Sequence, residues 1–364
     1  MGEKDELRLQ EKPGIEHKRL KDTLVATARF NLRDREALRP ALIELRQHVP
    51  GEYIAGPAFC IFQFVTSVTE GFDAEVGFPV TQAIEGGAVE TRILPGMEVL
   101  SLIHRGPVEA LGESYRRLYG YASEHGLVSD EFRREVYLDS DAEGGGEIEV
   151  QFVIHPWEEL LATNLAQVLG EEAARQVMQG SEELTVESGV AERFRWVRGA
   201  VERLEGSAGE GERYEILSRC AHVFPGSQIE KLRAVYEETK ARTGDVLAAV
   251  DAVIAFMDED PGWGERPRRE GKVLYSSKKP RDPEGYEKAE DRLEKRKAYC
   301  FCPLVREHLE EGMPVTFCNC GAGWYRQQWE GAIGKPVTIE IVRSILRGDD
   351  GCEFAIRLPD DLWV

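Results

Sequence analysis

The sequence predicts an α+β protein in which a duplicated strand–helix–strand–strand domain is followed by a helical and then mixed α+β domain rich in cysteine. Three observations support this. Before residue 156, stretches of alternating residues and stretches with helical spacing follow the order strand, helix, strands twice. Residues 157–205 have helical spacing almost throughout. Five of the seven cysteines lie from Cys300 onward, a clustering typical of metal binding or redox chemistry in a reducing compartment.

The first repeat begins with residues 23–32, which alternate and are rich in strand formers. Residues 35–50 have helical spacing that stops at Pro50. Two further strands are expected at residues 59–65 and 76–80.

The second repeat begins with a pair of strands at residues 89–106, interrupted by a Pro-Gly pair. A strongly amphipathic helix at residues 108–126 ends at a glycine. Strands at residues 133–141 and 147–154 complete the repeat. No sequence identity between the repeats is visible, so the duplication is inferred from the pattern alone.

The length of 364 residues allows two or three domains. We expect a charged tail at residues 1–20, the duplicated domain at 21–156, a helical connector at 157–205 and the cysteine-rich domain at 206–364. In the last domain helices are expected up to residue 260, then a basic loop at 262–283 and two closing strands.

The net charge is −20, from 66 acidic and 46 basic side chains. Such a field repels phosphates and favours cationic or neutral ligands, so we expect no nucleic-acid partner. No apolar run of 18 or more residues is present and the N-terminus has no apolar signal core. We therefore expect a cytoplasmic protein with no membrane partner; the sequence leaves the oligomeric state open.

The strand that ends at His104 leads through a Gly-Pro turn directly into the second helix. We interpret this histidine as a hydrogen-bonding brace for the turn rather than as a catalyst. In the last strand, EIEVQFVI, alternation places Glu149 and Gln151 on one face. The strand REVYLDSD precedes it.

In this order, the HRGP turn, the YGYASEHGL helix end and the EVYLDSD and IEVQFV strands resemble the GyrI-like small-molecule-binding family, the effector-binding domain of bacterial transcription activators. The resemblance covers Lys21 to Pro156. It implies a central groove lined by aromatic side chains, with a glutamate of the last strand facing the ligand. Glu149 occupies that position, and Phe59 and Tyr137 are the expected walls.

A carboxylate in an aromatic cup attracts a hydrophobic cation or a hydrogen-bonding neutral aromatic. Burial would also raise the pKa of Glu149 and make it a candidate catalytic acid or base. Some stand-alone members of the family are reported as hydrolases of small electrophilic compounds, so a hydrolase is the alternative function. The other interpretation places Glu149 on the solvent face of an edge strand. About twenty residues precede the first strand, too few for the helix-turn-helix that transcriptional members carry.

The string YCFCPLVREHLEEGMPVTFCNCGAGW contains two Cys-x-Cys pairs, Cys300 with Cys302 and Cys318 with Cys320. Four thiolates brought together by two loops would satisfy a zinc ion, our first choice, or an iron–sulfur cluster. The neighbouring Pro303, Gly321 and Gly323 suit tight turns. Reduced thiols in a core and a redox pair remain alternatives. Whether Cys220, His222 and Cys352 join the site stays open.

The YCFCP and FCNCGAGW strings and the ending GDDGCEFAI resemble 4-vinyl-reductase-like and 2-amino-thiazoline-carboxylate hydrolase-like proteins over about residues 158–364. The resemblance implies a small-molecule-binding domain, in some members with a metal. The first hypothesis is therefore a small-molecule-binding protein with a GyrI-like pocket and a cysteine-rich, metal-binding second domain. A hydrolase using Glu149 or the metal is the second, and a structural zinc module is the third.

Overall fold

A computed structural model describes residues 14–63, 72–84, 89–125, 127–138, 146–185, 188–224, 226–259 and 266–363. The chain divides into two compact units. The N-terminal unit comprises residues 1–63, 68–121 and 132–154, and the C-terminal unit contains the remainder, chiefly residues 155–364.

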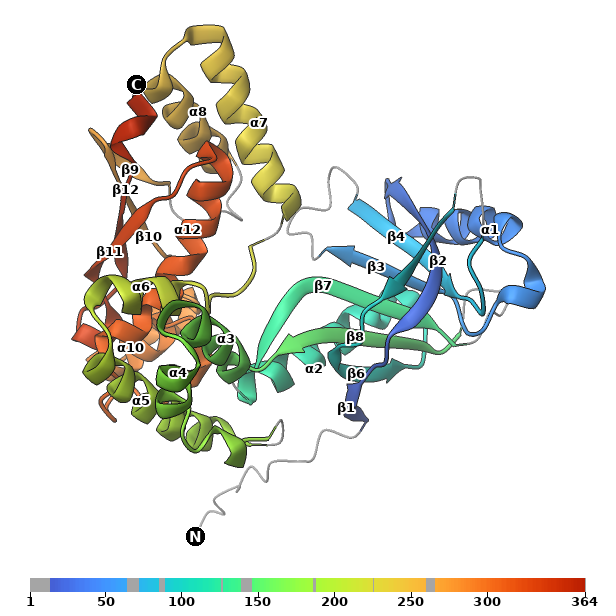
Figure 1. The fold of residues 1–364 in the computed structure, drawn as a ribbon, viewed down its shortest axis with the longest axis horizontal. Coiled ribbons are helices and arrows are strands. Elements are labelled where there is room, and N and C mark those ends of the chain that lie inside the picture. The colour runs from blue at the N-terminus through green and yellow to red at the C-terminus, as the bar shows by residue number, and fades with distance from the viewer. Residues whose placement is uncertain are drawn as a thin grey trace. The chain divides into compact units, whose positions relative to one another are not determined.

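The N-terminal unit is built on one antiparallel sheet of eight strands with the order β1-β6-β8-β7-β3-β4-β2-β5 (Figure 1). The strands are β1 (Ile15–Arg19), β2 (Thr23–Leu32), β3 (Phe59–Gln63), β4 (Phe72–Pro79), β5 (Glu90–Leu94), β6 (Glu98–His104), β7 (Val128–Tyr137) and β8 (Ile148–His155). Helix α1 (Leu38–His48) connects β2 to β3, and α2 (Leu111–Glu124) connects β6 to β7.

The predicted duplication is visible in this strand order. The first repeat is β2-α1-β3-β4 and the second is β6-α2-β7-β8. In the sheet they appear as β6-β8-β7 followed by β3-β4-β2, so the two halves mirror each other about the β7–β3 pair. The α+β fold class and the strand–helix–strand–strand repeat are therefore confirmed.

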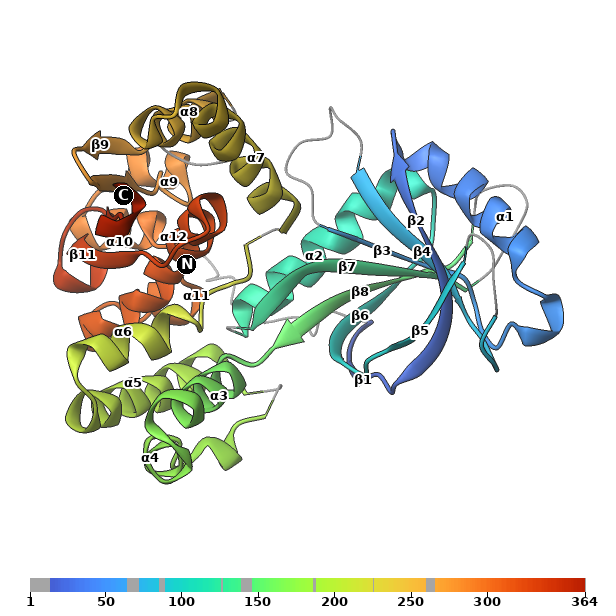
Figure 2. The same ribbon diagram turned by 45° about the horizontal axis from the view of Figure 1, so that its top comes forward.

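Both helices cover the same face of the sheet (Figure 2). The apolar side of α1, with Leu38 and Leu45, packs on Cys60 and Val76. The ring of Tyr115 from α2 lies 5.7 Å from that of Phe152. Because neighbouring residues of a strand point to opposite faces, Phe59 and Val136, paired across β3 and β7, lie on the other face. We call these the helix face and the open face.

The turn before α2 contains Gly106, whose φ of 143° is in the region that favours glycine. His104 Nδ1 lies 3.0 Å from Ser114 Oγ, and Nε2 lies 3.1 Å from the Pro107 carbonyl oxygen. The prediction that His104 braces this turn is confirmed.

The expected tail at residues 1–20 needs a correction. Residues 1–13 lie outside the described residues, but Ile15–Arg19 form β1, which pairs antiparallel with β6. Ile15 is placed opposite Leu102 and Arg19 opposite Glu98, so the alternation of this charged segment suits an edge strand.

The C-terminal unit begins with helices α3 (Trp157–Leu169), α4 (Glu171–Val177), α5 (Val190–Ser207), α6 (Glu210–Ser218), α7 (Gly226–Thr243) and α8 (Val246–Glu259). It continues with α9 (Pro283–Lys288), α10 (Arg292–Tyr299), α11 (Pro303–Arg306) and α12 (Asn319–Ile333). Its antiparallel sheet has the order β11-β12-β10-β9, from β9 (Arg268–Glu270), β10 (Val273–Ser277), β11 (Thr338–Arg343) and β12 (Glu353–Arg357).

Two expectations for this unit were wrong. The basic loop at residues 262–283 contains the hairpin β9–β10, because Gly271, with φ of 62°, allows the tight connection. The second Cys-x-Cys string lies at the start of α12 rather than in a turn. Gly323 serves helix packing there: a Cβ atom on it would stand 1.8 Å from the Ser218 carbonyl oxygen at the end of α6.

Among the described helices, none is both long and apolar enough to span a bilayer.

Candidate functional sites

The most deeply buried carboxylate of the N-terminal unit belongs to Glu135 on the helix face of β7, with an exposed fraction of 0%. Tyr115 on α2 donates its hydroxyl to Oε1 over 2.6 Å, and Tyr137 donates to Oε2 over 2.8 Å. Arg35, in the turn just before α1, donates from Nη2 to Oε2. One carboxylate thus joins α2, β7 and the entrance to α1.

A second cation, which is buried, lies on the same face. Arg133, two residues before Glu135 on β7, is 2% exposed. Its guanidinium carbon lies 4.1 Å from the centroid of the Phe152 ring, and Nη2 donates to the Tyr119 hydroxyl over 2.7 Å. The aromatic rings between sheet and α2 therefore already accommodate a cation, by the attraction between a positive charge and a ring face.

The two tyrosines act as donors in this cluster. Burial, followed by the negative charge of Glu135, raises the pKa of Tyr115 and of Tyr137 well above the ordinary value of 10.0. Both hydroxyls therefore stay protonated at neutral pH and hold the carboxylate by hydrogen bonds.

Glu149 on β8 lies on the open face and is only partly buried, with 12% of its side chain exposed. Lys18 Nζ donates to its Oε1 over 2.9 Å, and the Ser101 hydroxyl donates to the same oxygen. Burial by itself raises the pKa of Glu149, but these hydrogen bonds outweigh it and the pKa lies below its ordinary value. The expectation of a raised pKa is therefore wrong. It considered burial alone, whereas β1 places the Lys18 ammonium beside the carboxylate.

The structure does not bring the three expected pocket residues together. Phe59 shares the open face with Glu149, but it is fully buried and its ring lies against Gly77, where a Cβ atom would come within 2.4 Å of Cζ. The guanidinium of Arg134 lies 4.7 Å from this ring. Tyr137 is on the helix face with Glu135.

A separate open cavity of about 520 Å³ lies between β1, β6 and the start of α2. Charged side chains line it, among them Glu16, Arg105, Glu113 and Arg117. It does not include Phe59, Tyr137, Glu149 or Glu135.

In the C-terminal unit, five thiols line one cavity of about 140 Å³: Cys300, Cys302, Cys318, Cys320 and Cys352. Three separate segments deliver them: the stretch between α10 and α11, the start of α12, and the residue before β12. The backbone is extended at Cys300 and Cys302. Their side chains therefore share one side, while Phe301 between them is 48% exposed.

Backbone groups form hydrogen bonds with some of these thiols, those of Leu304 and Val305 with Cys302 and that of Ile345 with Cys352. Cys318 Sγ lies 3.1 Å from the Ser344 hydroxyl, and Cys320 donates to the Cys220 carbonyl oxygen over 3.2 Å. Burial raises the pKa of Cys300 to about 12 and that of Cys302 to about 11, so without a bound cation the thiols are protonated. Across the part of the chain that the structure describes, no three His, Cys, Asp or Glu side chains lie close enough together to hold one metal ion.

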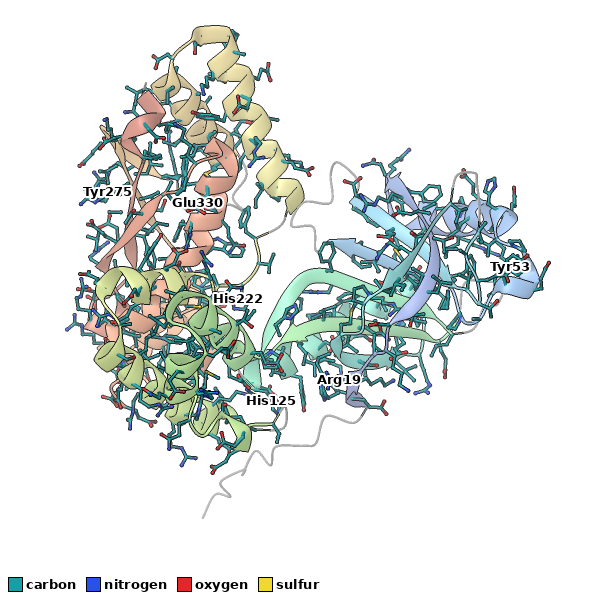
Figure 3. The ribbon with its side chains drawn as sticks, in the orientation of Figure 1. Arg19, Tyr53, His125, His222, Tyr275 and Glu330 are labelled. Carbon is teal, nitrogen blue, oxygen red and sulfur yellow. The ribbon has the colours of Figure 1, made fainter. Side chains whose placement is uncertain are left out.

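Of the three residues that the sequence left open, Cys352 lines the cavity, and the other two differ in position. Cys220 is fully buried but is not part of the cavity wall; its thiol donates to the Ile216 carbonyl oxygen over 3.4 Å. His222, labelled in Figure 3, follows α6 and lines the cavity together with Lys278.

Comparison with known proteins bears on the N-terminal unit. Residues 36–154 match the GyrI-like small molecule binding domain. This part of the chain is a GyrI-like domain.

The GyrI-like domain is similar to several solved structures. The C-terminal domain of EcmrR is 22% identical, with a TM-score of 0.34 and coverage of 39% of this chain and 96% of that one. In EcmrR bound to DNA the match, of the same score and identity, spans 57% of that chain. SAV2435 bound to tetraphenylphosphonium is 11% identical, with a TM-score of 0.29 and coverage of 40% and 96%. No curated protein matches the sequence.

Sequence reasoning missed Glu135 and its partners in the GyrI-like domain. The available signal was the alternation of Arg133, Glu135 and Tyr137 on one face of a strand that also carries apolar residues. Arg35, 100 residues away, gives no local sign of contact with this strand.

Proposed function

We propose that the GyrI-like domain binds a small hydrophobic cation or a neutral aromatic molecule at Glu135. The observation that supports this most strongly is a fully buried carboxylate held by two tyrosine hydroxyls and one arginine beneath the two helices. Buried charges of this kind, set among aromatic rings, are frequent at ligand sites.

The arrangement also indicates how a ligand would enter. Arg35 is 33% exposed and lies in the turn before α1, whereas Tyr115 belongs to α2 and Tyr137 to β7. A cation that replaces Arg35 keeps the carboxylate paired, and the rings of Tyr115 and Phe152 supply apolar surface for the rest of the ligand. The net charge of −20 favours the approach of cations.

Titration calorimetry with tetraphenylphosphonium tests the site, with the variant Glu135→Gln and the matched control Glu149→Gln. We expect Glu135→Gln to weaken binding about 10- to 100-fold, roughly 1–3 kcal/mol, the contribution of a charge-assisted contact. Glu149→Gln should leave affinity unchanged, since Glu149 lies on the other face and is paired with Lys18. Unchanged binding by Glu135→Gln would refute the site, and loss through Glu149→Gln would move it to the open face.

Binding rather than hydrolysis is proposed because Glu149 is poorly placed for either catalytic function. Its pKa lies below the ordinary value, so the carboxylate is ionised and cannot act as a general acid, and Lys18 and Ser101 already donate to the oxygen that a general base would use. A hydrolase would need its chemistry from the cysteine-lined cavity instead.

The proposal contains no nucleic-acid partner. The excess of acidic over basic side chains opposes phosphate binding. A mobility-shift series at low salt should show no sequence-dependent complex, and a tight one would bring a regulator function back.

The second part of the proposal concerns the C-terminal unit, which binds a metal through its thiols in a reducing, cytoplasmic compartment. None of the seven cysteines, all of which the structure describes, is in a disulfide. Five of them surround one cavity, and a metal would convert these protonated thiols into bound thiolates.

A further inference from the structure

The cavity in the C-terminal unit, which is partly open, has cysteines along its wall rather than gathered at one point. Five thiols from three segments face this space of about 140 Å³. A single zinc ion draws four ligands together at about 2.3 Å each and leaves no room between them. Thiols arranged around a cavity suit a larger cofactor instead, one that contains several metal atoms and its own bridging atoms.

We propose that this cavity holds an iron–sulfur cluster bound by the thiolates of Cys300, Cys302, Cys318 and Cys320, with Cys352 at the same wall. The inference rests on the proposed metal-binding function of the C-terminal unit and names the metal cofactor. It replaces zinc, which the sequence favoured, as the first choice.

The composition of the wall agrees with this cofactor. Among the described residues, no aspartate or glutamate lines the cavity, and His222 is the only imidazole. Cysteine thiolates are the usual ligands of iron–sulfur clusters, while hard cations such as Mg²⁺ and Ca²⁺ prefer oxygen. Phe317, Trp324 and Phe354 contribute apolar surface that keeps water from the cluster.

Positive charge and hydrogen-bond donors lie where a cluster with four thiolates would carry negative charge. Lys278 lines the cavity, with Nζ 5.3 Å from the Phe301 ring centroid. The Ser344 hydroxyl, 3.1 Å from Cys318 Sγ, can donate to a thiolate. Hydrogen bonds to sulfur are a main determinant of cluster stability and potential.

Metal analysis of the full-length protein, purified without chelators and without oxygen, tests the inference. We expect iron and acid-labile sulfide in equal amounts, with visible absorption that bleaches on reduction by dithionite. Stoichiometric zinc without sulfide would overturn the cluster and leave the proposed metal-binding function standing. Protein without any metal, with all seven thiols titratable, would overturn both.

Cysteine variants then test the ligands. The double variant Cys302→Ala/Cys320→Ala should lose most of its iron and sulfide, because two of the four ligands are gone. The matched control Cys220→Ala removes a buried thiol of the same unit that does not line the cavity, and Cys60→Ala removes one in the N-terminal unit; both should keep the wild-type iron content. Undiminished iron in the double variant, or equal loss in the controls, would refute this ligand set.

Discussion

Glu135 in the N-terminal unit and the thiols in the C-terminal unit are both withdrawn from water, but the chain surrounds them differently. Both oxygens of Glu135 receive hydrogen bonds from side chains of the same unit. The five cysteines line a cavity, and their hydrogen bonds are made with backbone groups and the Ser344 hydroxyl rather than with charged side chains. Burial of a charge is costly unless the charge is paired, whereas a neutral thiol is buried like a small apolar group.

The two sites therefore differ in how they affect the stability of their units and in what a ligand must displace to bind. Removing one partner from the Glu135 cluster leaves a buried charge or hydroxyl without its partner, so the stability of this unit is sensitive to the loss of any member of the cluster. The thiols contribute little until a metal binds them, and their space is already open. A ligand at Glu135 must replace an internal partner, whereas a ligand among the thiols enters a cavity that is already present.

The tryptophans allow the two units to be followed separately. All six lie from Trp157 onward, so tryptophan fluorescence reports the C-terminal unit. Amide hydrogen exchange of peptides from residues 132–137 of β7 reports opening of the N-terminal unit.

The largest effect is expected for Glu135→Ala. It leaves the Arg35 guanidinium, which is partly exposed, and the buried Tyr115 and Tyr137 hydroxyls without their acceptor. Two unsatisfied buried hydroxyls cost about 2–6 kcal/mol, at roughly 1–3 kcal/mol each. Hydrogen exchange should show the opening free energy at β7 reduced by this amount, while the denaturation midpoint from tryptophan fluorescence stays in place. The control Glu149→Ala, on the open face, should cost much less. A reduction below about 1 kcal/mol for Glu135→Ala would show that the cluster is not a stabilising element.

A smaller effect is expected for Ser344→Ala in the metal-free protein, in which burial raises the pKa of Cys318 and keeps its thiol neutral. Its hydroxyl, fully buried, is within 3.1 Å of Cys318 Sγ and accepts from the Leu346 amide over 3.1 Å. Losing neutral hydrogen bonds costs about 0.5–1.5 kcal/mol. The fluorescence-detected midpoint should fall correspondingly, with no change in exchange at β7. A loss of stability as large as that for Glu135→Ala would mean that the Cys318 thiol is charged. The two sites would then both contain a buried charge.

The sequence predicted the duplication because alternation and helical spacing are local properties. It also predicted that the two Cys-x-Cys pairs lie near each other, but not which elements bring them together. Gly323 was expected in a turn, although its function is to let α12 approach Ser218, which depends on distant packing. Glu135 was missed since a glutamate is normally exposed, and its burial depends on Tyr115 and on Arg35 from other elements. Alternation placed Glu149 and Gln151 together, but it cannot tell which face the helices cover.

The smallest effect concerns the other carboxylate, Glu149, and its pairing with Lys18. Lys18 is 34% exposed, so the pair contributes only about 0–1 kcal/mol. Because the pKa of folded Glu149 lies below its ordinary value of 4.5, this contribution is present above pH 4.5 and is lost as the pH falls through the folded pKa. The stability difference between wild type and Glu149→Gln, from exchange at β8, should therefore be greatest near neutral pH and vanish in acid. A difference that grows as the pH falls would mean that the carboxyl is favoured in its protonated form, as the original expectation of a raised pKa required.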